Sequence, residues 1–293
     1  MKNQVYLFAN AFMAVIVLLS SGCASNDRPA LSGHVVATLN VPYVEGIDDH
    51  QRSLDIYQSA ESASNAPVHV YVHGGAWTRG DKSNLSPQQI EAYIDHGVVL
   101  VSINYRLGPA HRFPANSQDL VDASIWLKNN IDQFGGDPTR MVLSGHSAGA
   151  HLTALFAVGT PSAPAPNSDT FYRAVFSVDT ALYDMTRDFE ARGLVLRWLL
   201  KQKRLVFGED KQAQALASPL HQIRPSRSYS DFYLYVTETR PEAVEQLWQF
   251  EKALSEHGHV VQAQVIPKLT HFQMKAALFT PGHRIFEDVM AAF

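Results

Sequence analysis

The pentapeptide Gly145-His146-Ser147-Ala148-Gly149 constrains the fold more than any other part of this 293-residue chain. An apolar run, Met141-Val142-Leu143, precedes it, and a helix-compatible run from Ala150 to Ala157 follows it. Glycines two positions either side of a serine suit a sharp, strained turn from strand to helix, because side chains there would collide with neighbouring backbone. The sequence therefore predicts that Ser147 lies at the tip of such a turn.

Strand-like and helix-like segments alternate along most of the chain. Apolar runs predict strands at 68–73, 98–104, 141–143, 174–178, 232–236 and 260–266. Apolar residues at helical spacing predict helices at 117–134, 150–157, 243–257 and 285–293. This alternation predicts an α/β fold, a mostly parallel sheet flanked by helices, over residues 35–293. The stretch from about 186 to 230 has helical segments and no convincing strand, and we expect it to form a small helical cap.

A second glycine motif, His73-Gly74-Gly75-Ala76-Trp77, follows the first predicted strand. A Gly-Gly pair lets backbone N–H groups approach a ligand with no Cβ atom in the way. Acyl transfer creates a negatively charged oxygen that needs such donors, each worth about 3–4 kcal/mol. We expect an oxyanion hole formed by the N–H groups of Gly74, Gly75 and Ala148.

One of the 13 histidines falls where a base for Ser147 is expected. His271 follows the last predicted strand and precedes the last predicted helix, and we expect it in a loop at the carboxyl edge of the sheet, where the Ser147 turn also lies. The chain order, serine first and histidine near the C-terminus, agrees with this arrangement. The sequence predicts Ser147 as a nucleophile and His271 as its base.

Other residues near these motifs are expected to be structural. Trp77 either lines a pocket or packs, and His151, one turn past Ser147, is expected to be a hydrogen-bonded core histidine. The segment 104–106 is expected to brace the Gly-Gly loop, and Arg106 is in a position to pair with Asp119.

Five segments together resemble one known family. They are residues 73–82, 104–107, 112–115, 134–138 and 144–152. They are similar to the motifs of the carboxylesterase and kynurenine-formamidase-like branch of the α/β hydrolases, from about Leu54 to the C-terminus. The resemblance implies the α/β-hydrolase fold, hydrolysis of esters or N-formyl amides without metal or cofactor, and the roles already given to Ser147, His271 and the oxyanion donors.

The acid of the expected triad departs from this family's pattern. The family places it a few residues after the strand that is predicted to end at Val236, in a Gly-x-x-Asp or Gly-x-x-Glu stretch. Here Thr237 replaces the glycine and Arg240 stands in the place of the acid. We predict instead that Glu238 supplies the carboxylate for His271, because it lies on the same loop and its extra methylene group can span the offset.

Two other carboxylates remain open as alternatives. Asp179 follows the preceding predicted strand, which ends at the same edge of the sheet. Glu242 follows Pro241 and resembles a first-turn helix residue, where negative charge suits the helix dipole. Without any of these acids, Ser147 and His271 would act as a dyad.

The first residues form a separate unit. Lys2 precedes an apolar run that is clearest over 12–19, and small residues lead to Cys23, the one cysteine in the sequence. The pattern predicts a signal peptide over residues 1–23, and the residues before Cys23 resemble a bacterial lipobox. We expect lipidation at Cys23, a polar tether over 24–34, and a membrane-anchored lipoprotein of the bacterial envelope, in the outer membrane of a Gram-negative host. Plain secretion and an uncleaved anchor helix are the alternatives, although the run is short for a bilayer.

The charge of the chain argues against nucleic acid as a partner. The net charge is −4 and no basic block occurs, so nucleic acid is a poor candidate. We expect a serine hydrolase that cleaves small carboxylic esters through an acyl-enzyme, with no cofactor and no metal. An arylformamidase-like amide hydrolase and a degenerate hydrolase acting as an envelope binding module are the alternatives.

Overall fold

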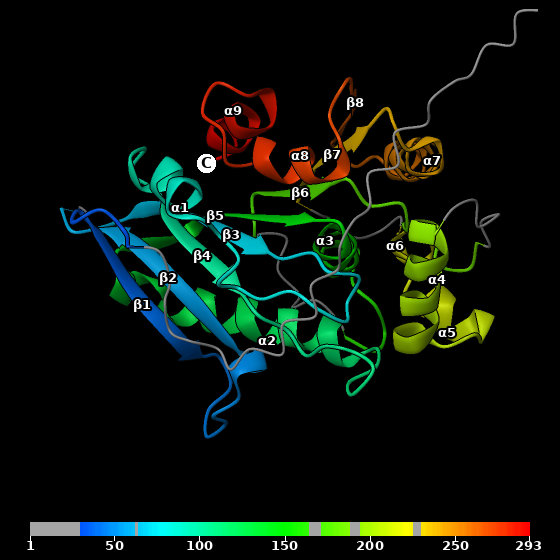
Figure 1. Ribbon diagram of the computed structural model, residues 1–293, viewed down its shortest axis with the longest axis horizontal. Helices are drawn as coiled ribbons and strands as arrows, with labels where there is room; N and C mark the ends of the chain where they lie inside the picture. The colour runs from blue at the N-terminus through cyan, green and yellow to red at the C-terminus, as the bar shows by residue number, and fades with distance from the viewer. Residues whose placement is uncertain (1–29, 62–63, 164–170, 188–193, 225–229) are drawn as a thin grey trace, which may run out of the picture.

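The computed structural model describes residues 30–61, 64–163, 171–187, 194–224 and 230–293. In this part of the chain eight strands form one sheet in the order β1-β2-β4-β3-β5-β6-β7-β8 (Figure 1). The strands are β1 Val35–Pro42, β2 Ser53–Ser59, β3 Ala66–Val72, β4 Val99–Ile103, β5 Gly136–His146, β6 Ala174–Val178, β7 Asp231–Thr237 and β8 Val261–Ile266. The expected signal peptide and Cys23 lie outside the described residues. No helix within the described residues has both the length and the apolarity to span a membrane.

The sheet is parallel except at one side. Strand β2 runs antiparallel to both β1 and β4, and every other neighbouring pair is parallel. The prediction of a mostly parallel sheet is therefore confirmed. The sequence did not predict β1 and β2, because β1 is an edge strand with mostly exposed residues, and the buried β2 carries polar Ser53 and Asp55 among its apolar residues.

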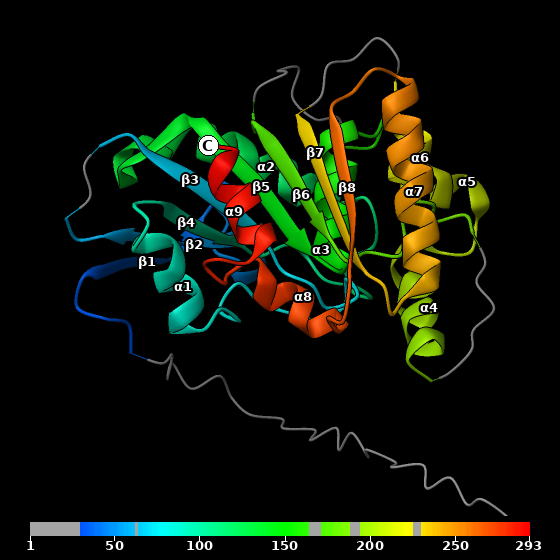
Figure 2. The ribbon, with the colours of Figure 1, turned by 90° about the horizontal axis from the view of Figure 1, so that it is seen from above.

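Helices cover both faces of the sheet (Figure 2). The helices are α1 Pro87–Ile94, α2 Ala115–Asn130, α3 Ala148–Val158, α4 Leu194–Phe207, α5 Lys211–Leu216, α6 Pro219–Gln222, α7 Pro241–Glu256, α8 His271–Ala277 and α9 Arg284–Ala291. Buried residues of α2, α3 and α7 pack with one set of strand side chains, and those of α1, α8 and α9 pack with the other. Because strand side chains alternate between faces, Val70 contributes to the first core and Tyr71 to the second.

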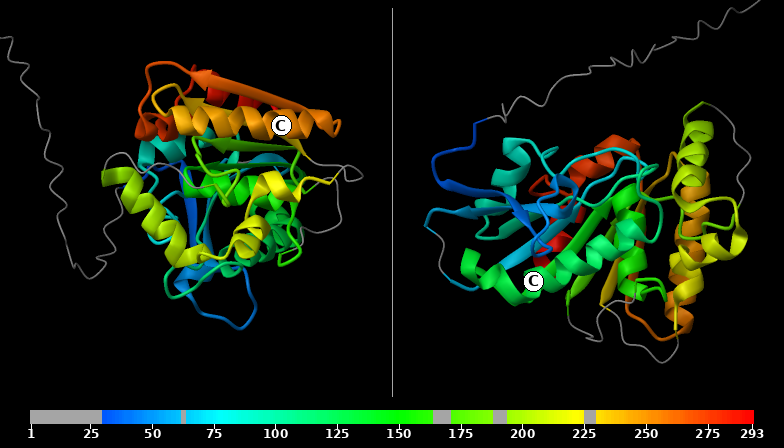
Figure 3. Two further views of the ribbon diagram at one scale, coloured as in Figure 1. Left: turned by 90° about the vertical axis from the view of Figure 1, so that its right-hand side faces the viewer. Right: turned by 90° about the horizontal axis from the view of Figure 1, so that it is seen from below.

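Among the described residues, α4, α5 and α6 follow β6 and precede β7 in the chain. In space these helices lie beside α7 (Figure 3). This is the segment in which a helical cap is expected. The end of α4 packs on the loop after β3: the ring of Phe207 meets that of Trp77 edge-on, with centroids 5.1 Å apart. The Thr78 hydroxyl of the same loop donates to Gln202 Oε1 of α4 at 3.0 Å. Helix α4 therefore supports the Gly-Gly loop from outside the sheet.

Candidate active site

Ser147 lies at the turn between β5 and α3, as its glycine pattern predicts. Its backbone has φ 59° and ψ −117°, a conformation that residues with a side chain rarely adopt. Its N–H donates to Val178 O at 2.9 Å, which ties the turn to the end of the neighbouring strand β6. The side chain stays partly exposed although the residues on either side are buried. Such strain is common at functional sites, where the surrounding structure holds it in place.

The two glycines of the pentapeptide are needed for backbone packing. A Cβ on Gly145 would lie 2.4 Å from the backbone of Gly149, and a Cβ on Gly149 would lie 2.1 Å from Val72 O. A side chain at Gly145 would therefore push apart the two ends of the turn, and one at Gly149 would push the turn away from β3. The glycine pattern is therefore explained by close contact within the turn and with the neighbouring strand.

The loop after β3 passes directly beside Ser147. A Cβ on Gly74 would lie 2.9 Å from His146 O and 3.1 Å from the Cβ of Ser147, so only glycine allows this approach. Gly75 has φ +127°, and a Cβ there would meet Arg79 O at 2.0 Å. The structure thus brings Gly74 next to the turn that begins α3 at Ala148, where the expected oxyanion donors must meet.

Residues 105 and 106, which follow β4, brace the loop after β3. The Tyr105 hydroxyl donates to His73 O at 3.1 Å, and the two rings stack with centroids 4.5 Å apart. Arg106 Nη2 pairs with the buried carboxylate of Asp119 at 2.8 Å, and the Arg106 N–H donates to it at 2.7 Å. The expected pair and the expected bracing role are both confirmed.

Trp77 and His151 are buried side chains of the core. Trp77 is only 1% exposed, and its Nε1–H donates to His151 Nδ1 at 3.2 Å. His151 Nε2–H donates to Ala217 O at 2.8 Å. Of the two interpretations of Trp77, the structure supports packing, and it confirms His151 as a hydrogen-bonded core residue.

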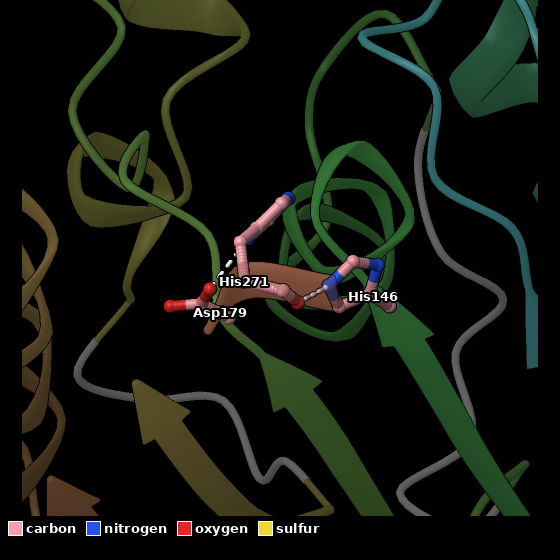
Figure 4. Close-up of side chains that lie close together, drawn as sticks. All are labelled: His146, Asp179 and His271. Carbon is pink, nitrogen blue, oxygen red and sulfur yellow. Dashed lines mark hydrogen bonds and ion pairs between the residues drawn. The ribbon is translucent and has the colours of Figure 1, made fainter. Parts of the chain in front are cut away.

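His271 begins helix α8, which corrects the expectation that it lies in a loop. The physical reason is a capping box: the Thr270 hydroxyl accepts from the Gln273 N–H, and the Gln273 side chain accepts from the Thr270 N–H. His271 O accepts a hydrogen bond from His146 Nε2 at 2.8 Å, and the two rings lie 4.5 Å apart between centroids (Figure 4). The first turn of α8 is therefore held against the residue that precedes Ser147.

The carboxylate that contacts His271 belongs to Asp179, immediately after β6 (Figure 4). Asp179 Oδ2 lies 2.5 Å from His271 Nδ1, and its Oδ1 accepts from the Thr237 N–H at 3.2 Å. The side chain is fully buried and the backbone has φ 61°. Burial by itself would raise the pKa of Asp179, but the hydrogen bond with His271 and the charge of Arg240 outweigh it, so the pKa is lowered from its usual value. Asp179 is therefore an ionised acceptor at neutral pH.

The prediction that Glu238 supplies this carboxylate is wrong. Glu238 Oε1 instead accepts from the N–H of Lys268 at 2.8 Å. The N–H of Glu238 donates to Ile266 O, so pairing with the edge strand β8 extends to this residue and its side chain lies over the loop after β8. Glu242 does not contact the imidazole either, and lies 3.6 Å from Arg240 Nε. The available signal for Asp179 was its position directly after a strand next to β5.

His146, Asp179 and His271 have donor atoms within 4.8 Å of one another, a set that by residue type alone suits a metal ion. Arg240 Nη1, however, lies 3.2 Å from Asp179 Oδ2 and 2.9 Å from His271 Nδ1. A guanidinium this close already neutralises the carboxylate and would repel a second cation. The arrangement suits an acid, a base and a nucleophile better than a metal centre.

Comparison with known proteins agrees with this geometry. Residues 54–181 match the BD-FAE family model. Esterase LipC of Mycobacterium tuberculosis is 37% identical over 109 residues, which are 37% of this chain and 27% of LipC. Esterase LipQ of the same organism is 34% identical over 151 residues, 51% of this chain and 34% of LipQ. The matches thus span about a quarter to a third of these two relatives.

A solved structure extends the comparison to most of the fold. Esterase B from Lactobacillus rhamnosis superposes with a TM-score of 0.68 and 20% identity, over 81% of this chain and 76% of that one. The chain thus has the α/β-hydrolase fold, with a strained serine between β5 and α3 and an aspartate–histidine pair beside it. Within that fold, the chain is similar over part of its length to named esterases, which agrees with the resemblance of its motifs.

Proposed function

We propose that this chain is a serine esterase that hydrolyses carboxylic esters, with Ser147 as nucleophile, His271 as base and Asp179 as the acid of the triad. The observation that carries the proposal is the contact between Asp179 Oδ2 and His271 Nδ1, placed beside the strained turn of Ser147. The named esterases among its relatives support the same activity.

The proposed reaction uses each of these contacts. The ionised Asp179 accepts a hydrogen bond from the Nδ1–H of His271, which keeps the proton on Nδ1 and leaves the Nε2 lone pair free to accept the proton of the Ser147 hydroxyl. Ser147 Oγ then bonds to the ester carbonyl carbon, and the carbonyl oxygen becomes an oxyanion held by the N–H groups of the oxyanion hole. Collapse expels the alcohol, which takes the proton from Nε2, and water repeats the sequence on the acyl-enzyme.

The oxyanion hole is proposed at Gly74, Gly75 and Ala148. The close approach of Gly74 to the Cβ of Ser147 supports it, since the donors must lie about 3 Å from an oxygen bonded to the serine-linked carbon. The N–H of Ala148 belongs to the first residue of α3, where backbone donors have no partner within the helix.

The two competing functions differ in how much support remains. The alternative of a degenerate binding module depends on the missing acid of the family pattern. It loses support because the carboxylate of Asp179 contacts His271, the proposed base. An arylformamidase-like activity would use the same residues on an N-formyl amide, so substrate comparison has to separate it from esterase activity.

The test compares purified wild type with Ser147→Ala. We expect wild type to hydrolyse p-nitrophenyl acetate faster than N-formylkynurenine and to react with a fluorophosphonate probe. The Ser147→Ala variant should lose at least about 10³-fold of kcat/KM and all probe labelling, because the acyl-enzyme cannot form. A folded Ser147→Ala variant that retains substantial turnover or labelling would exclude Ser147 as the nucleophile. A wild type that prefers N-formylkynurenine to the ester would favour the arylformamidase-like activity.

We also propose that the protein is exported and anchored through a lipid on Cys23, with the catalytic domain outside the cytoplasm. Support for this comes from the amino-terminal sequence alone: the apolar run over 12–19, the small residues after it and the lone cysteine. Small-molecule esters at the cell envelope would then be the substrates.

A further inference from the structure

Arg240 stands where the pattern of the family that this chain resembles has an acid, and its side chain reaches the Asp179–His271 pair. It lies between β7 and α7 and is 18% exposed at its side chain. Its Nη1 donates to Asp179 O at 2.9 Å and lies 3.2 Å from Asp179 Oδ2. The same atom lies 2.9 Å from His271 Nδ1. One guanidinium nitrogen thus touches both members of the pair.

These contacts decide where the proton on the imidazole lies. His271 Nδ1 cannot donate to Asp179 and accept from Arg240 at once, because it carries either a proton or a lone pair. A lone pair facing a carboxylate oxygen at 2.5 Å would be repulsive, so Nδ1 holds the proton and donates it to Asp179. Arg240 therefore donates to Asp179 O, forms an ion pair with Asp179 Oδ2, and places its positive charge against the imidazole without sharing a proton with it.

We propose that Arg240 is a positioning residue that fixes the displaced acid Asp179 and places against His271 a positive charge that offsets the negative charge of Asp179. This inference rests on the proposed function, in which a neutral His271 is the base. An imidazolium beside Asp179 alone would be strongly stabilised, and protonated His271 cannot accept the Ser147 proton. The guanidinium offsets that stabilisation, so the enzyme stays active at lower pH.

The other charged or titratable groups around His271 do not replace this role. His146 packs against the ring from β5, and burial lowers its pKa to about 3, so it stays neutral over the working range. Lys275 lies one turn further along α8, and its Nζ donates to Asn84 O. Glu242 lies 3.6 Å from Arg240 Nε. Replacing Arg240 alone leaves the hydrogen bonds of His146 and Lys275 in place and removes the ion pair of Glu242.

The test is the pH profile of kcat/KM on an activated ester for wild type, Arg240→Met and Arg240→Lys. The methionine variant keeps an unbranched apolar stem but removes the guanidinium and its charge, and we expect the acid-side midpoint to rise by roughly one pH unit. The lysine variant retains the charge, so its midpoint should stay close to that of wild type even where kcat falls. A folded Arg240→Met variant with an unchanged midpoint would overturn the proposal.

Two controls separate this effect from other causes. Arg284→Met removes an arginine paired with Asp288 at 2.7 Å on α9 and changes the net charge equally, so an equal shift in that variant would mean a general charge effect and would also overturn the proposal. The second control is an NMR titration of the His271 ring in the Ser147→Ala background, with and without Arg240→Met. It needs no turnover, so an inactive wild type would refute the esterase while this titration still tests Arg240.

Discussion

At the scale of residues, Ser147 and Asp179 share an unusual property: both follow a strand directly and both have positive φ. A non-glycine residue in such a region costs on the order of 1–3 kcal/mol, which neighbouring contacts must offset. For Asp179 these contacts include its own N–H donating to Tyr235 O at 2.7 Å and its carboxylate meeting His271. The strain turns the carboxylate out of the strand direction and toward the imidazole.

The first prediction compares two carboxylates near the site. Asp179→Asn should lower kcat/KM by about 10³–10⁴-fold, because an amide at this position favours the wrong imidazole tautomer. Glu238→Gln, the matched control from the loop after β7, should stay within about twofold, since its side chain accepts from Lys268 and does not contact His271. Both enter the same activated-ester assay. The opposite ranking of the two variants would return the acid to Glu238.

At the scale of elements, α4 holds the Gly-Gly loop in position. Phe207, 4% exposed, packs between Trp77 and Phe113, and the ring of His151 lies 5.5 Å from it. The backbone adds a second tie, since the Phe113 N–H donates to Val206 O at 3.0 Å. Helix α4 therefore supports the proposed oxyanion hole through packing under the Gly-Gly loop.

The second prediction removes this packing. Phe207→Ala should cost about 3–5 kcal/mol in the free energy of unfolding, because it opens a cavity beneath the loop. In the fraction of the variant that still folds, the fall in kcat should be larger than the rise in KM, because the displaced N–H donors belong to the proposed oxyanion hole. Trp248→Ala, an aromatic on α7 that is 45% exposed, is the control and should change both quantities little. Urea unfolding and steady-state kinetics measure the two effects, and equal losses in both variants would argue against a special role of α4.

At the scale of the whole molecule, four buried histidines make the fold sensitive to acid. Burial lowers the pKa to about 3 for His69 and His146, and to about 4 for His73 and His151. In the unfolded chain these groups bind protons near their ordinary pKa of about 6.5. Because the folded pKa is the lower one, stability is fully present above about pH 6.5 and is lost as the pH falls toward the folded values, by up to about 1.4 kcal/mol per pH unit for each histidine.

The third prediction tests this dependence with urea unfolding at several pH values between about 7 and 5, the range in which only the unfolded chain takes up these protons. Wild type should lose stability steeply, and His151→Gln should show a shallower slope because one buried imidazole is gone. The exposed His221, replaced by glutamine, should leave the slope close to that of wild type. Stability that stays constant over this interval would contradict the account.

The fourth prediction concerns the proposed anchor. Cys23→Ser should move the full-length protein from the membrane fraction to the soluble fraction of its bacterial host and abolish incorporation of labelled palmitate, because no thiol remains to be acylated. Ser25→Ala, two residues further on, is the control and should remain in the membrane. A Cys23→Ser protein that still sediments with the membrane would favour an uncleaved anchor helix.

The amino-acid sequence by itself determined the features that depend on neighbours in the chain. Hydrophobic periodicity predicted the parallel strands and the helices α2, α3, α7 and α9, because burial on one face imposes a fixed spacing, whereas the shorter α1 and α8 were not predicted. The Ser147 turn was equally predictable, since the clash that excludes a side chain at Gly145 is with Gly149, four residues away. The edge strand β1 escaped prediction because it buries too little apolar surface to leave a pattern.

Only the tertiary structure decided which carboxylate contacts His271. Asp179 and His271 are 92 positions apart in the chain, and no local spacing connects them. Pairing of Val178 with Tyr235 aligns the ends of β6 and β7. Asp179 and Arg240 therefore meet beside His271, the first residue of α8. Glu238, nearer to the usual place in the chain, is drawn instead toward the loop after β8. Periodicity encodes the type of each element, but a contact between ends of different strands depends on sheet order and register, which this sequence does not reveal locally.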